Sequence, residues 1–154
     1  PAPLPPHLLE AAIYCDDLDR AEAFYGDVLG LPRIQRVGDR HVFFRVGTGT
    51  LLVFNPHETA KPPGNPKMPV PPHGAHGPGH VCFAMPAEAI ARWRDRLTAA
   101  GIDIETEFAW PNGAQSLYFR DPNGYPLEIS LTTRVPDERD AADAALTIQA
   151  NCSI

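Results

Sequence analysis

The chain has 154 residues, of which 21% are charged and 44% hydrophobic, and its formal net charge is −6 at pH 7. An acidic chain without a Lys or Arg cluster argues against nucleic acid and acidic membranes as partners, because binding to either depends on neutralising negative charge. No apolar run approaches the roughly 20 residues of a bilayer span, so we expect a cytoplasmic protein. Its three cysteines, Cys15, Cys82 and Cys152, fit neither a disulfide framework nor a zinc knuckle.

Residues 8–55 predict a β-α-β-β unit. The segment 8–15 is apolar and bounded by proline and aspartate, as is typical of a strand. Asp16 or Asp17 can cap the helix that follows, in which apolar residues recur three and four positions apart until Gly30 ends it in the left-handed conformation. Strands are then predicted at 41–46 and 50–54, around the tight turn 47–49, with a further strand around 33–37.

A second unit, residues 79–132, repeats this order after a loop at 56–78. The chain between Asn55 and Gly79 contains eight prolines and has no periodicity, so we expect a linker or a lid. After a strand at 80–85, a helix starts near Pro86 and stops at Gly101. Further strands are predicted at 102–108, 116–120 and 126–131, the last two joined by the turn 121–124.

Aligning the two units pairs a glutamate with a histidine at the start of the first strands. The aligned positions are Glu10 with His80, Gly30 with Gly101, Phe44 and Arg45 with Phe119 and Arg120, Gly49 with Gly124, and Val53 with Glu128. Side chains alternate between the two faces of a strand, so Glu10 shares a face with Tyr14, and His80 with Cys82. The opposite face of each strand is suited to packing under the helix.

Three segments in this order resemble the vicinal oxygen chelate superfamily, which includes glyoxalase I, extradiol dioxygenases, fosfomycin-resistance transferases and bleomycin-resistance proteins. They are residues 11–31, Gly79-His80-Val81 and residues 121–128. The resemblance covers about residues 8–132 and implies an α+β fold, in which two βαβββ modules form a curved, cup-like mixed sheet with helices outside. We therefore expect a single glyoxalase/bleomycin-resistance/dioxygenase-like domain over 1–132, followed by a tail at 133–154.

The resemblance also implies a divalent metal ion at the bottom of the cup. The ligand positions of the family carry over to Glu10, Val53, His80 and Glu128. Valine cannot bind a metal, so Glu10, His80 and Glu128 remain as three protein ligands with open positions, as a catalytic metal requires. A cation would also offset the several kcal/mol that a buried, ionised carboxylate costs in an apolar strand.

The identity of the metal stays open among Mn²⁺, Zn²⁺, Ni²⁺, Mg²⁺ and Fe²⁺, because two carboxylates and one imidazole form a comparatively hard site. Each ligand also has a simpler interpretation. His80 could hydrogen-bond at a strand end, Glu10 could lie in water at the mouth of its strand, and Glu128 could be a solvated edge residue. His73 and His76 in the loop could join a histidine cluster, although such loops commonly carry exposed histidines.

We expect an enzyme of lyase, isomerase, transferase or dioxygenase type, which chelates adjacent oxygens of a small-molecule substrate on its metal. Contacts to the substrate are expected from Tyr14, Val53, Cys82 and Phe119. Cys82 could also be a nucleophile, but a small buried thiol is far commoner. The alternative function is a metal-free small-molecule-binding protein of the bleomycin-resistance type, with Trp110 and Tyr118 as further aromatic residues in its groove. A third possibility is a vestigial site in an assembly or regulatory protein.

Two expectations concern the parts outside the site. Open sheet edges favour a symmetric homodimer, in which the site lies within one chain or between two. The tail predicts a capped helix at 137–149, acidic on most of its surface, which we expect to pack on the outside of the protein.

Overall fold

The computed structural model describes residues 7–62, 64–111 and 113–132. The chain divides into two compact units. Among the described residues, the first comprises 7–79 with the segment Asp121–Gly124, and the second comprises His80–Arg120 and 125–132. No helix in the described ranges is long and apolar enough to cross a membrane. The helix predicted at 137–149 lies outside these ranges.

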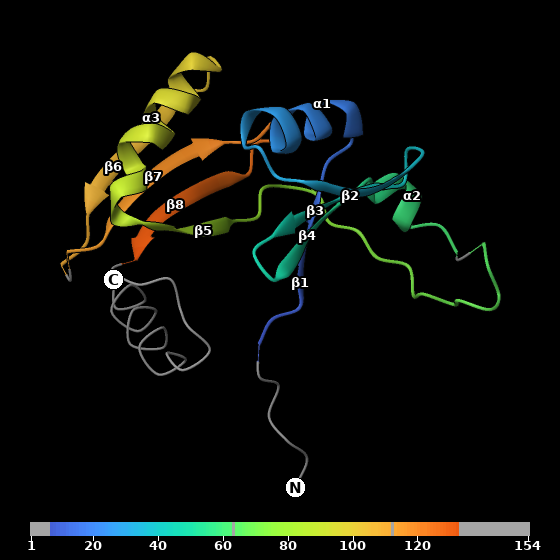
Figure 1. The fold of residues 1–154 in the computed structure, drawn as a ribbon. Helices are drawn as coiled ribbons and strands as arrows, with labels where there is room; N and C mark the ends of the chain where they lie inside the picture. Colours follow the sequence, from blue (N-terminus) through green and yellow to red (C-terminus); the bar gives the residue numbers. More distant parts are fainter. Residues whose placement is uncertain (1–6, 63, 112, 133–154) are drawn as a thin grey trace, which may run out of the picture. The chain divides into compact units, whose positions relative to one another are not determined.

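The strands of the first unit form one four-stranded mixed sheet in the order β1-β4-β3-β2 (Figure 1). β1 runs parallel to β4, and the other neighbours are antiparallel. The single-turn helix α2 was not predicted, because four residues are too few to show a helical period. Its elements are β1 (Glu10–Tyr14), α1 (Leu18–Glu22), the π-helical η1 (Ala23–Val28), β2 (Arg33–Val37), β3 (His41–Val46), β4 (Gly49–Phe54) and α2 (Pro56–Thr59).

The second unit has the same topology, with the strand order β5-β8-β7-β6 and β5 parallel to β8. Its elements are β5 (Val81–Pro86), η2 (Ala87–Ala89), α3 (Ile90–Ala99), β6 (Ile104–Ala109), β7 (Gln115–Arg120) and β8 (Pro126–Thr132). The two βαβββ modules predicted from the internal repeat are therefore confirmed, and Glu10 and His80 stand at the start of equivalent strands.

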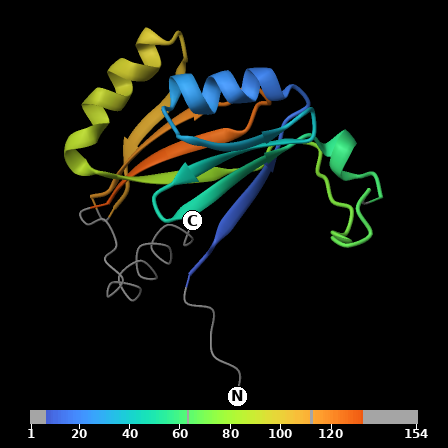
Figure 2. The ribbon, with the colours of Figure 1, turned by 45° about the vertical axis from the view of Figure 1, so that its right-hand side comes forward.

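In each unit a helix packs on one face of the sheet, as Figures 1 and 2 show for α1 and α3. On that face the central strands carry buried apolar residues such as Ile13, Val53 and Leu127, and the other face includes the polar candidates for the site. Asp17 begins α1 by accepting hydrogen bonds from the backbone N–H groups of Asp19 and Arg20 at 3.1 and 3.0 Å. Gly30 and Gly101 end the helical segments with φ of 75° and 70°, as predicted.

The hairpin connections differ in length between the units, and this corrects one predicted alignment. Leu52 pairs with Ala12 as Glu128 pairs with Cys82, so Leu52 and not Val53 is equivalent to Glu128. Four residues separate the paired Arg45 and Thr50, whereas five separate Arg120 and Pro126. An alignment on the turn glycines is therefore one residue out of register, and such a slip moves a side chain to the other face of the sheet.

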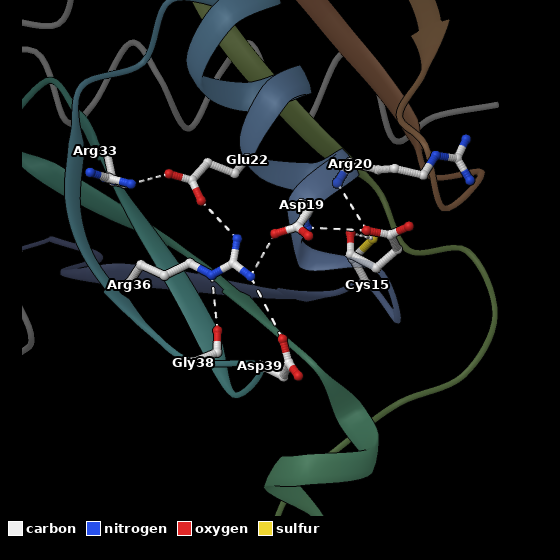
Figure 3. A network of polar contacts seen from close by, with 9 residues as sticks. Cys15, Asp19, Arg20, Glu22, Arg33, Arg36, Gly38 and Asp39 are labelled. Atoms are coloured by element: carbon white, nitrogen blue, oxygen red, sulfur yellow. Dashed lines mark hydrogen bonds and ion pairs between the residues drawn. The ribbon is translucent and has the colours of Figure 1, made fainter.

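Charged residues link β2 to the helix of the first unit (Figure 3). The Arg36 guanidinium donates to Glu22 at 2.7 Å, lies 2.8 Å from Asp19, and donates from Nε to the Gly38 carbonyl at 2.9 Å. Arg33 also contacts Glu22 but is far more exposed, with 57% side-chain exposure against 20% for Arg36. The hydrogen bond from Arg36 is the main cause that lowers the pKa of Glu22 below its usual 4.5.

We predict that Arg36→Ala lowers the free energy of unfolding by about 1 kcal/mol at neutral pH. A carboxylate with a lowered pKa stabilises the fold above its unfolded-state pKa, and this contribution is lost as pH falls through the folded-state value. The difference between wild type and variant should therefore shrink below pH 4.5. Arg33→Ala, the matched control, should cost less than about 0.5 kcal/mol. Equal losses for the two variants in urea denaturation, or a difference independent of pH, would contradict this role.

Candidate functional site

Glu128 is the central polar residue of the second unit. It lies on β8 between the apolar residues Leu127 and Ile129, and only 6% of the residue is exposed. Ser116, which lies on β7 opposite Ser130 and is fully buried, donates its hydroxyl diagonally to Glu128 Oε1. The same hydroxyl accepts a hydrogen bond of 2.8 Å from the Trp110 indole. The buried carboxylate is thus held by a short chain of hydrogen bonds within the sheet.

His80 completes the polar centre from the residue before β5. Its Nδ1 lies 2.8 Å from the carbonyl oxygen of Pro126, and its Nε2 lies 3.2 Å from Glu128 Oε2. A carbonyl can only accept, so Nδ1 carries a proton, and in a neutral imidazole Nε2 then presents a lone pair to the carboxylate. The two acceptor atoms can lie at this distance when a hydrogen, carried by either group, or a metal cation is placed between them.

Two neighbouring groups keep their protons at neutral pH. Burial, with a smaller contribution from hydrogen bonding to Glu128, raises the pKa of Tyr118 to about 12. Burial and the negative charge of Glu128 raise the pKa of the Cys82 thiol to about 12, although one side of this residue is exposed. Cys82 is therefore poorly suited to act as a nucleophile, because only the thiolate attacks.

A row of rings runs across the same face of the second sheet. The His80 and Tyr118 rings are stacked with centroids 6.1 Å apart, and Tyr118 is stacked on Phe108 at 5.9 Å. Trp110 meets Phe108 edge-on at 4.8 Å. Phe108 is 40% exposed and half of the His80 side chain is accessible, so a ligand can reach this row. Such a surface suits a ligand with an apolar portion beside its polar groups.

The first unit supplies Glu10 and Tyr14. Glu10 opens β1 on the face away from the helix, is exposed, and has no hydrogen-bond or ion-pair partner among the described residues. The Tyr14 hydroxyl, four residues along the same face, lies 3.0 Å from His73 Nδ1. Over the parts of the chain that the structure describes, no three His, Cys, Asp or Glu side chains form a group that could hold a metal ion. The structure thus brings His80 and Glu128 together, and a metal triad with Glu10 stays a prediction.

Two predicted substrate contacts are wrong. Val53 and Phe119 are fully buried, and both lie on the face of their sheet that packs in the core. Side-chain alternation places their neighbours Leu52 and Tyr118 on the face that carries the candidate site. Ser116 was missed because a serine in a strand gives no sequence signal until its cross-strand partner is known.

The family model described as Glyoxalase/Bleomycin resistance protein/Dioxygenase superfamily matches residues 7–129. A putative ring-cleaving dioxygenase, MhqE of Bacillus subtilis (strain 168), is 28% identical over 115 residues. That match covers 69% of this chain but 35% of the relative, so the chain spans about a third of the length of this curated relative.

Among solved structures, lactoylglutathione lyase from Agrobacterium tumefaciens is 41% identical, with a TM-score of 0.77. The match covers 82% of this chain and 94% of that chain. The fosfomycin resistance protein FosX from Listeria monocytogenes superposes with a TM-score of 0.61, over 82% of this chain and 93% of its own. Its 18% identity indicates a common fold alone.

We predict that Ser116→Ala lowers the free energy of unfolding by about 1–3 kcal/mol, because it leaves the buried Glu128 oxygen and the Trp110 N–H without this partner. Ser130→Ala is the matched control. Ser130 contacts the same hydroxyl at 3.4 Å, beyond the usual O–H···O range, and its removal should cost about 0.5 kcal/mol or less. Urea denaturation measures both, and an equal loss in the two variants would show that the chain of hydrogen bonds does not stabilise the site.

We also predict slow alkylation of Cys82. With a thiol pKa of about 12, iodoacetamide at pH 8 should modify it at least tenfold more slowly than N-acetylcysteine. Glu128→Gln removes a negative charge that raises this pKa, so alkylation should become several-fold faster. Mass spectrometry of the peptide that contains Cys82 separates its reaction from those of the other cysteines. Reaction of the wild-type residue at the rate of the free thiol would overturn the prediction.

Proposed function

This chain belongs to the Glyoxalase/Bleomycin resistance protein/Dioxygenase superfamily, and we propose that it is a metal-dependent enzyme acting on a small molecule with adjacent oxygen atoms. The observation that carries the proposal is the pairing of His80 Nε2 with Glu128 Oε2 at 3.2 Å. Because Nδ1 is engaged with a carbonyl, Nε2 is the ring nitrogen left to bind a cation, and imidazole nitrogen with carboxylate oxygen is a common ligand set for divalent metals.

The donor atoms of His80 and Glu128 suit such an ion. His80 and Glu128 would hold it from the second unit, and the exposed carboxylate of Glu10 would be the third protein ligand. The Pro126 carbonyl fixes the tautomer of His80 and leaves Nε2 for the metal, as carbonyls do for histidine ligands in general. Ser116 orients the Glu128 carboxylate in the same way.

When bound, a divalent cation supplies Lewis-acid chemistry, stabilising negative charge that develops on an oxygen of the substrate. The protein residues have complementary roles. Tyr118 keeps its hydroxyl proton at neutral pH and can donate a hydrogen bond beside Glu128. The ring row formed by His80, Tyr118, Phe108 and Trp110 would cover the apolar part of a substrate and exclude water from it.

The similarities favour a lyase as the first reaction to test. The lyase neighbour is matched over 94% of its chain at 41% identity, whereas the dioxygenase relative is matched over 35% of its length. The compound in the name of that neighbour, lactoylglutathione, carries a hydroxyl and a carbonyl oxygen on adjacent carbons, as the proposed chelation requires. Dioxygenase activity is the second reaction class to assay.

The metal itself is tested by elemental analysis of purified protein after dialysis against Mn²⁺, Zn²⁺, Ni²⁺, Mg²⁺ and Fe²⁺ in turn. We expect close to one bound ion per chain for at least one of them. His80→Ala and Glu128→Gln should each weaken binding at least tenfold, because each removes one ligand atom. His76→Ala, which changes an exposed histidine of the first unit, should bind like wild type.

Glu10→Gln separates two versions of the proposal. A tenfold loss of affinity with an unchanged melting temperature would support the triad, and an unchanged affinity would remove Glu10 from the ligand set. Absence of metal binding in folded wild-type protein would refute the metal-dependent enzyme and leave the metal-free binding protein.

The homodimer expected from the sequence stays a prediction, and light scattering at micromolar concentration checks it.

A further inference from the structure

Five rings gather on the face of the first sheet that is turned away from its helix. We call them the ring cluster. Phe54 on β4 contacts every other member: Phe43 at 5.4 Å, His41 at 5.7 Å, His73 at 4.6 Å and Tyr14 at 6.3 Å between ring centroids. Four of the rings come from strands, and only His73 belongs to the proline-rich loop.

The His73 side chain enters this cluster from the loop and contacts both Phe54 and Tyr14. Its ring meets Phe54 nearly edge-on at 78°, and its Nδ1 lies 3.0 Å from the Tyr14 hydroxyl, which can donate to it. The backbone N–H of His73 donates to the Thr59 carbonyl at 3.1 Å, where the loop turns back beside α2 (Figure 2). The described residues of the loop from 64 to 72 are all exposed, so the loop is anchored near its His73 end.

His41 is a second polar group in the cluster and is not satisfied. Its ring is stacked on Phe43 at 4.1 Å and 10°, and both ring nitrogens are inaccessible without a hydrogen-bond partner among the described residues. Burial, assisted by the charge of Arg40, lowers its pKa, so the imidazole is neutral. By strand register His41 is the equivalent of Ser116, but Leu52 stands where the second unit has the acceptor Glu128.

We propose that the ring cluster is a binding site for a small, flat, unsaturated heterocycle with a hydrogen-bond-accepting nitrogen, and that the His73 imidazole occupies it as an intramolecular substitute. A ligand of this class would take the hydrogen bond of Tyr14 and the edge contact with Phe54. Since the ligand competes with His73, its affinity for the wild-type protein is reduced by the fraction of chains in which the loop is docked.

All of these residues belong to the first unit, so the proposal does not depend on a metal at His80 and Glu128. The experiment uses the full chain treated with a chelator, and imidazole is the probe. Binding is followed by NMR shifts of the Tyr14 and Phe54 ring signals. His73→Ala empties the position, and we expect its imidazole dissociation constant to be at least tenfold lower than that of wild type. His76→Ala, in the same loop and exposed, is the matched control and should bind like wild type.

Two further measurements define the chemistry. Tyr14→Phe in the His73→Ala background should lose most of the gain, because it removes the hydrogen-bond donor. Tetrahydrofuran, which has a similar ring size and an acceptor oxygen but no aromatic faces, should bind His73→Ala at least fivefold more weakly than imidazole. His73→Ser, studied in parallel, guards against a folding defect of the alanine variant. Folded His73 variants that bind imidazole no better than wild type, or an equal gain in His76→Ala, would overturn the proposal.

Discussion

A carboxylate buried in a β-sheet is the constraint on which the candidate site depends. Glu128 is only 6% exposed, and a buried carboxyl group requires hydrogen-bond partners for its oxygens. Ser116 donates to one oxygen, and His80 faces the other from the start of β5. The negative charge of Glu128 also raises the pKa of Cys82 and Tyr118, so both neighbours remain protonated. The Pro126 carbonyl holds His80 Nδ1, so Nε2 is the ring nitrogen that faces Glu128.

The two units share a topology but differ in the chemistry of the face turned away from the helix. Leu52 and Phe43 stand in the first unit where the second has Glu128 and Tyr118. Loss of the acid turns that face into a cluster of rings, and His41 consequently has no acceptor opposite it. Both units therefore carry rings on this face, but the buried acid is present only in the second, while apolar packing under the helix is common to both.

The two proposals concern different residues of the chain. The metal proposal concerns His80 and Glu128 and takes Glu10 as a third ligand, and it draws support from the superfamily to which the chain belongs. The ring cluster draws on no relative, because His73 comes from a proline-rich loop outside the repeated strands. One proposal can therefore fail without affecting the other.

Local pattern in the sequence determined the repeat, the order of helices and strands along each unit, an aspartate cap at Asp16 or Asp17, and the terminating Gly30 and Gly101. These features depend on alternation, helical period and backbone conformation over a few residues. His80 and Glu128 could also be found in this way, since a charged or polar residue in an apolar strand is conspicuous. The tertiary structure alone decided the register. Because the hairpin connection of the second unit is longer by one residue, Leu52 and not Val53 is equivalent to Glu128. Phe119 is buried in the core and does not line the site. Pairing across strands also brought Ser116 to Glu128 and His73 to Tyr14, since contacts between distant residues leave no trace in local periodicity.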